Sequence, residues 1–120
     1  MSTIETTFDI HDLREFVAAG DVEAFGALLA DDVEWRLIDQ RTPPAAPAVR
    51  RGRDEVVAMV RGAVEHGIAS HVTDGFVAGD RGALQLTCTY PTGGRVVENA
   101  LVEIRGGRIA RWSGVQAWDE

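Results

Sequence analysis

The chain has 120 residues, 45% of them hydrophobic, which is typical of a single globular domain with its own core and excludes global disorder. Its formal net charge is −7, and all 12 basic residues are arginines because the sequence contains no lysine. These facts exclude lysine Schiff-base chemistry and disfavour binding to nucleic acid or to an anionic membrane. The single cysteine, Cys88, excludes a disulfide within the chain.

Targeting and cofactor signals are also missing from the sequence. No apolar stretch approaches the ~20 residues that a membrane-spanning helix needs. Residues 1–10 lack the basic region and apolar core of a signal peptide, so we expect a cytoplasmic protein. No His and carboxylate cluster has the spacing of metal ligands, and we expect neither a metal nor a cofactor.

Two helices are predicted near the start of the chain. Apolar residues at helical spacing predict the first over residues 10–19, and Gly20 is expected to end it. The second is predicted over residues 22–30, with Asp21 as its N-cap. The acidic pair at 31–32 is expected to end that helix in a turn.

The middle of the chain combines a strand, a proline-rich segment and a third helix. Alternation of apolar and polar residues predicts a strand over 33–38. The segment 39–52 contains three prolines and is too long for a simple turn, so we interpret it as a lid or a mobile loop. A helix is predicted over 53–66, with Met59 in its apolar stripe.

From residue 69 onward the hydrophobic period changes to two, which predicts a four-strand meander. The predicted strands are 70–78, 82–90, 95–105 and 108–118. Glycine-rich pairs and the stretch at 91–94 supply the turns between them. Helices followed by an antiparallel meander indicate an α+β domain with helices on one face of a curved sheet.

This order of elements resembles the SnoaL-like branch of the NTF2-like superfamily, which includes ketosteroid isomerases, limonene epoxide hydrolases and polyketide cyclases. The segments that carry the resemblance are AGDVEA at 19–24, LADDVEW at 29–35, GRDEV at 52–56, VAGDR at 77–81 and EIRGGRIARW at 103–112. The resemblance implies one SnoaL-like domain over residues 1–120. Its fold would be an α+β cone, with three N-terminal helices packed on a curved, mostly antiparallel sheet that encloses a pocket.

The catalytic positions of those relatives carry other residues here. The resemblance places the tyrosine of the ketosteroid isomerases at Leu13, their basic aspartate near Leu37 and their oxyanion-hole aspartate near Ala100. The acidic residue of the polyketide cyclases falls on Gly114. The pocket implied by the resemblance therefore lacks the known catalytic groups of its enzyme relatives.

Strand facing inferred from the resemblance, together with the apolar stripe of the third predicted helix, gives a set of candidate pocket residues. They are Trp35, Leu37, Met59, Glu98, Trp112, Gln116 and Trp118. Glu98 is the candidate catalytic residue and the only ionisable group expected in the pocket. If it is buried against tryptophans, desolvation would raise its pKa and suit it to general acid/base work. The alternative is a glutamate that reaches solvent or pairs with Arg95 or Arg111.

Two functions remain open at this point. The first is a module that binds a small apolar molecule without catalysis. The second is a small isomerase, cyclase or hydrolase that acts on an apolar carbonyl compound through Glu98. We also expect a homodimer, because the sheet face opposite the helices carries apolar residues that need cover. The residues expected there are Val97, Leu101, Glu103, Ile109 and Val115.

Overall fold

The computed structural model describes residues 7–119, so the part of the signal-peptide prediction that concerns residues 1–6 lies outside the described residues. The helices are α1 (Ile10–Ala19), α2 (Val22–Ala27) and α3 (Arg53–Glu65). The strands are β1 (Leu29–Ile38), β2 (Ala48–Arg51), β3 (Ala69–Ala78), β4 (Arg81–Thr89), β5 (Arg95–Arg105) and β6 (Arg108–Trp118). Within the described residues, no helix is long and apolar enough to cross a membrane.

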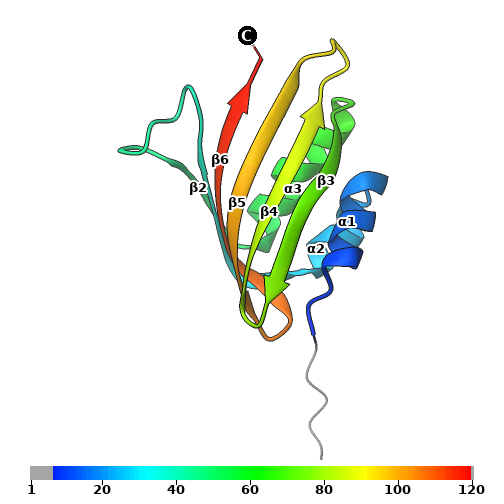
Figure 1. Ribbon diagram of the computed structural model, residues 1–120, viewed down its shortest axis with the longest axis vertical. Helices are drawn as coiled ribbons and strands as arrows, with labels where there is room; N and C mark the ends of the chain where they lie inside the picture. Colours follow the sequence, from blue (N-terminus) through cyan, green and yellow to red (C-terminus); the bar gives the residue numbers. More distant parts are fainter. Residues whose placement is uncertain (1–6, 120) are drawn as a thin grey trace, which may run out of the picture.

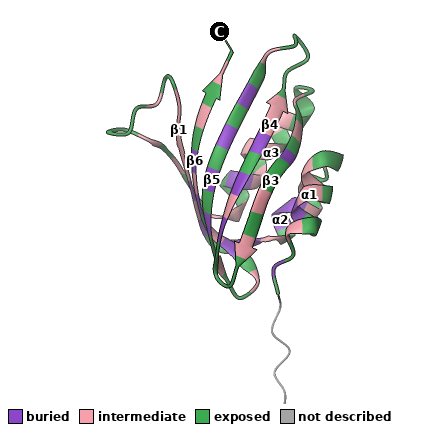
Figure 2. Cartoon of the chain, in the orientation of Figure 1, coloured by how far each residue is buried: buried purple, intermediate pink, exposed green. Residues whose placement is uncertain are grey.

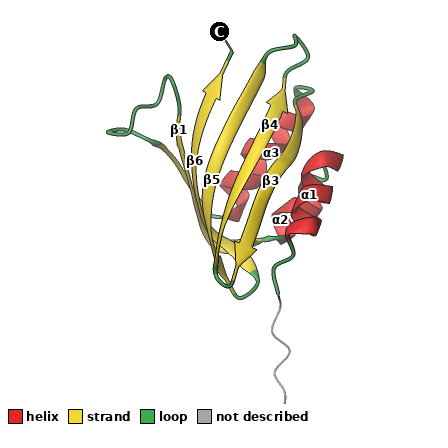
Figure 3. Cartoon of the chain, in the orientation of Figure 1, coloured by secondary structure: helices red, strands yellow, loops and turns green. Residues whose placement is uncertain are grey.

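The strands form one curved six-stranded sheet in the order β2-β1-β6-β5-β4-β3 (Figure 1). All neighbours are antiparallel except β1 and β6, which run parallel. The three helices gather on one face of the sheet (Figure 3). These features confirm the predicted α+β architecture and its mostly antiparallel sheet. The third helix follows β1 and β2 in the chain and is not contiguous with the first two.

Local signals set the ends of the helices, with one correction. Gly20 ends α1 in the left-handed conformation, at φ 65°, where a residue without Cβ is favoured. The second helix was predicted to reach residue 30 but ends at Ala27. The carbonyl of Leu28 accepts a hydrogen bond from the backbone N–H of Ile109 at 2.8 Å, and Leu29 is already paired with β6. The chain therefore joins the sheet before the acidic pair at 31–32, which lies within β1 and not in a turn.

The proline-rich segment is not a plain loop, because its last part forms β2. This short strand pairs antiparallel with β1 at the edge of the sheet. The connection before it, residues 39–47, projects away from the helices (Figure 1). Its Gln40 side chain accepts from the backbone N–H of Trp118 at 2.8 Å and donates to the carbonyl of Trp118 at 3.1 Å. This connection is therefore anchored to the end of β6.

Burial alternates along β5, as the bands in Figure 2 show. Glu98 lies on the helix-covered face, while Val97 and Leu101 are exposed on the other. The prediction that Ile109 lies on the outer face is wrong, because its side chain is fully buried. The pairing of β5 and β6 shifts between Glu103 and Ile104, so that Ala110 is an extra residue that reverses the facing before it.

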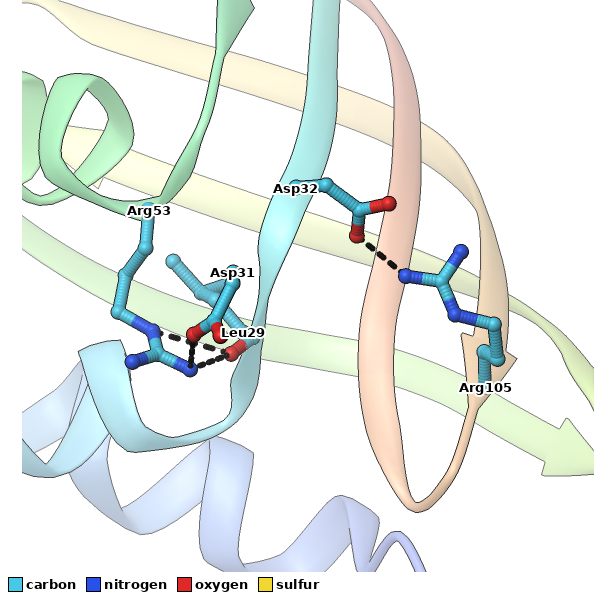
Figure 4. Close-up of polar contacts among 5 residues, drawn as sticks. All are labelled: Leu29, Asp31, Asp32, Arg53 and Arg105. Atoms are coloured by element: carbon cyan, nitrogen blue, oxygen red, sulfur yellow. Dashed lines mark hydrogen bonds and ion pairs between the residues drawn. The ribbon is translucent and has the colours of Figure 1, made fainter.

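Charged contacts fix the start of β1 (Figure 4). Arg53, the first residue of α3, donates from Nε and Nη2 to the carbonyl of Leu29 at 3.2 and 2.8 Å. Its Nη2 also lies 2.7 Å from the carboxylate of Asp31. The next residue, Asp32, pairs with Arg105 at the end of β5. These contacts hold the start of β1 between α3 and the β5–β6 hairpin.

Candidate functional site

A cavity of about 400 Å³ lies between the helices and the covered face of the sheet. Its lining comes from α1, α2, α3 and the strands β1, β3, β4, β5 and β6. The structure brings six of the sequence-predicted pocket residues to this cavity: Trp35, Leu37, Met59, Glu98, Trp112 and Gln116.

Trp118 does not line the cavity. It lies at the far end of β6, where its backbone pairs with Gln40 and its ring lies 6.0 Å from the guanidinium carbon of Arg41. The proline-rich segment is absent from the lining as well, so no residue of 39–52 covers the cavity as a lid.

Two stacked tryptophans form one wall of the cavity. Trp35 on β1 and Trp112 on β6 are direct partners in the parallel ladder. Their rings are stacked and nearly parallel, with centroids 4.2 Å apart and an angle of 6° between the planes. Phe25 of α2 meets Trp35 edge-on, with a centroid separation of 6.1 Å and an angle of 77°. This aromatic cluster is buried and gives the site a flat, apolar surface.

Glu98 supplies the polar centre of the cavity. Its side chain is only 5% exposed. The indole N–H of Trp112 donates to Oε2 at 2.5 Å, and the amide of Gln116 donates to Oε1 at 2.8 Å. No ion pair involves Glu98 within the described residues, and Arg95 pairs with Asp119 instead. Neither alternative reading of this residue, solvent contact or an arginine partner, describes what is seen.

The protonation of Glu98 follows from this environment. Burial raises the pKa of its carboxyl above the ordinary value of 4.5, and the hydrogen bonds from Gln116 and Trp112 oppose that rise without cancelling it. Gln116 can serve both protonation states, because a half turn of its amide exchanges a donor for an acceptor. The carboxyl can therefore hold or release a proton with little rearrangement around it.

Gly114 makes room for this carboxyl. It lies on β6 directly opposite Ala100, two residues from Gln116. A Cβ at this position would lie 2.9 Å from the Cδ of Glu98 and 3.0 Å from a methyl carbon of Leu37. Any side chain would therefore compete with the carboxyl for the same space. The position where the resemblance places an acid in polyketide cyclases is thus occupied by the carboxyl of Glu98, which arrives from the neighbouring strand.

The prediction that Glu98 is the only ionisable group of the cavity is wrong. Asp21 at the start of α2 and Cys88 on β4 also line it. Burial raises the pKa of the Cys88 thiol, and Ser70 donates a hydrogen bond to its sulfur at 3.2 Å. Alternation along β4 gives a signal for Cys88, because it shares the facing of the buried Leu86. Nothing local in the sequence shows that the start of α2 borders the cavity. Among residues 7–119, no group of three His, Cys, Asp or Glu side chains could hold a metal ion.

Solved structures with the same fold include proteins from several bacteria. An NTF2-like protein of unknown function from Mesorhizobium loti has a TM-score of 0.73 at 20% identity, with 92% of this chain and 88% of that chain covered. A protein with a cystatin-like fold from Silicibacter pomeroyi has a TM-score of 0.69 at 27% identity, with coverage of 89% and 72%. A protein with a ketosteroid isomerase-like fold from Catenulispora acidiphila, in complex with trimethylamine, has a TM-score of 0.65 at 18% identity, with coverage of 88% and 82%.

A search of the curated proteins found no significant match. The sequence itself matches a family across most of the domain, from the first helix to the middle of β6. The match covers residues 10–112 and identifies the SnoaL-like domain. It includes both stacked tryptophans and Glu98. The chain therefore belongs to the SnoaL-like domain family.

Proposed function

We propose that this protein binds a small apolar molecule in the cavity between its helices and its sheet. The observation that carries the proposal is the cavity of about 400 Å³, which has a wall of stacked indoles and one hydrogen-bonded carboxyl. Ligand sites are commonly mostly apolar cavities of about 300–1,000 Å³ with few, well-placed polar groups. The trimethylamine complex of the Catenulispora acidiphila protein adds support, because it pairs this fold with a small organic molecule.

The positions of the relatives' catalytic groups also favour binding over any named activity. Leu13 and Ala100 are buried apolar side chains, and Gly114 has no side chain at all. Leu37 lines the cavity with an aliphatic chain. None of these four residues can donate or accept a proton through its side chain.

A cavity-filling pair of variants tests this proposal. Ala63→Leu adds bulk to a residue of α3 that lines the cavity, whereas Ala58→Leu adds the same atoms to an exposed position of the same helix. Native mass spectrometry of the purified wild-type protein should show an added small-molecule mass. The added mass should disappear in Ala63→Leu and remain in Ala58→Leu. Equal retention by both variants would place the molecule elsewhere and reject the proposal.

A second candidate function is acid/base catalysis on an apolar carbonyl compound, and the raised pKa of the buried Glu98 favours it. In this reaction the carboxylate of Glu98 takes a proton from the carbon next to the carbonyl and later returns one. Exchange of these protons in cyclohexanone, followed by NMR in D₂O, measures the step directly. Glu98→Gln should abolish the exchange, and Glu103→Gln, an exposed acid on the same strand, should leave it unchanged. Exchange no faster than in buffer would reject catalysis of this kind.

We also propose that the protein acts as a cytoplasmic homodimer that pairs through the outer face of the sheet. That face exposes four apolar side chains, Phe76, Val97, Leu101 and Val115, whose exposed fractions are 63%, 41%, 68% and 57%. A second copy would remove this surface from water. Light scattering should return twice the mass of the chain for the wild type and a single mass for Leu101→Asp. A single mass for the wild type at micromolar concentration would reject the dimer.

A further inference from the structure

We propose that the preferred occupant of the cavity is an organic cation, an apolar molecule whose single protonated nitrogen donates a hydrogen bond to Glu98. This inference rests on the proposed ligand-binding function and names the chemical class of the ligand.

The charged lining of the cavity has one sign. Asp21 and Glu98 are acidic, and no arginine or histidine lines the cavity within the described residues. The nearby Arg61 of α3 is paired with Glu23, at 2.6 Å, and is not among the lining residues. A cavity with acidic groups and low-dielectric walls attracts cations and repels carboxylates and phosphates.

The carbonyl ends of α1 and α3 add negative potential, and the partial positive charge at the start of α2 is capped by the carboxylate of Asp21, which accepts from the N–H of Ala24. The last residues of α1, Ala18 and Ala19, line the cavity, and so does Val64 in the last turn of α3. The carbonyl end of a helix carries a partial negative charge, and neither helix has a basic residue in its last turn. His66 caps α3, where its Nδ1 lies 2.6 Å from the carbonyl of Gly62, but its side chain does not line the cavity.

Glu98 retains the capacity to bind a cation. Each of its oxygens accepts one hydrogen bond, from Trp112 or from Gln116, so each keeps a second acceptor position. The other titratable groups that face the cavity are Asp21 from α2 and Cys88 from β4, and neither can supply a positive charge. The described lining of the cavity offers Glu98 no basic side chain as a partner. A protonated ligand nitrogen would therefore provide the countercharge, through a charge-assisted hydrogen bond.

Three ligands with one carbon skeleton test the inference on the full chain. Cyclohexylmethylamine is a cation at neutral pH, cyclohexylmethanol is neutral and cyclohexanecarboxylate is an anion. Isothermal titration should show amine binding about tenfold tighter than alcohol binding, and no carboxylate binding. Glu98→Gln should remove the preference, so that the amine binds no more tightly than the alcohol. Glu103→Gln, which removes the same charge from an exposed site on β5, should preserve the preference.

The outcomes separate this inference from the function on which it rests. If the alcohol binds as tightly as the amine, or the carboxylate binds best, the inference is overturned and ligand binding stands. If the preference survives in Glu98→Gln or is lost equally in Glu103→Gln, the assignment to Glu98 is overturned. If none of the three molecules binds the wild type, the cavity is not a binding site and both proposals are rejected.

Discussion

The space that Gly114 leaves for the carboxyl of Glu98 leads to a quantitative prediction for Gly114→Ala. The new methyl carbon would lie 2.9 Å from the Cδ of Glu98 and 3.0 Å from the Cδ2 of Leu37. The carboxyl must then move, which breaks its hydrogen bonds with Trp112 and Gln116. Overpacking of a core costs about 1–3 kcal/mol, and each of the two hydrogen bonds contributes about 0.5–1.5 kcal/mol net. We expect a total loss of about 3 kcal/mol, because partial movement of the side chain relieves part of the clash.

Urea denaturation followed by circular dichroism measures this loss, and a double-mutant cycle assigns it to the carboxyl. In the Glu98→Ala background the methyl group has room, so Gly114→Ala should cost less than about 1 kcal/mol. Gly62→Ala is the control glycine substitution, because a Cβ there meets nothing within 4 Å. It lies within α3 and should stabilise the protein by up to about 1 kcal/mol. An equal cost of Gly114→Ala with and without the Glu98 carboxyl would refute the reasoning.

Three further predictions concern the same region. Because the pKa of Glu98 is raised by burial, the native state holds its proton more tightly than the unfolded chain. The stability that this proton provides is present below pH 4.5 and is lost as the pH rises through the folded pKa of Glu98. The urea midpoint of Glu98→Gln should therefore rise relative to that of the wild type from acidic to neutral pH. A difference between the two midpoints that does not change with pH would contradict the raised pKa. Trp112→Phe removes a donor to the carboxylate, so NMR titration of the ¹³C-labelled carboxyl should show a still higher pKa for Glu98; a lower value would contradict the role of the indole N–H. Arg53→Met removes the donors to the carbonyl of Leu29 and should cost about 1–3 kcal/mol of unfolding free energy. An unchanged unfolding free energy would mean that solvent replaces these donors and would contradict the prediction.

Local patterns predicted most of the fold. The 3.6-residue period gave α1 and α3 to within one residue, and the period of two gave the four strands of the meander. The facing of Glu98 could be predicted because β5 alternates without interruption from Val96 to Glu103. The facing of Ile109 could not, because the extra residue Ala110 appears only in the pairing with β5.

The remaining errors have tertiary causes. The last residues predicted for α2 joined the sheet because β6 offered Leu28 and Leu29 backbone partners, and no local signal reports a distant strand. The strand β2 was not predicted, because the three prolines that precede it indicate a loop. A short strand at the edge of a sheet nevertheless tolerates prolines beside it. Asp21 was missed in the cavity because its local role as an N-cap gives no indication of what packs beside it.

The parallel contact between β1 and β6 has a consequence for the order of folding. The strands from β3 to β6 are joined by short turns, whereas Glu34 on β1 pairs with Arg111 near the other end of the chain. Closing so long a loop costs conformational entropy before any contact repays it, so such contacts form slowly. We expect the meander to form first and β1 to dock last. Trp35 reaches Trp112 only across that contact, so quenching of indole fluorescence in stopped-flow refolding should follow the slowest phase. The cavity between the helices and the sheet would then be the last part of the molecule to form.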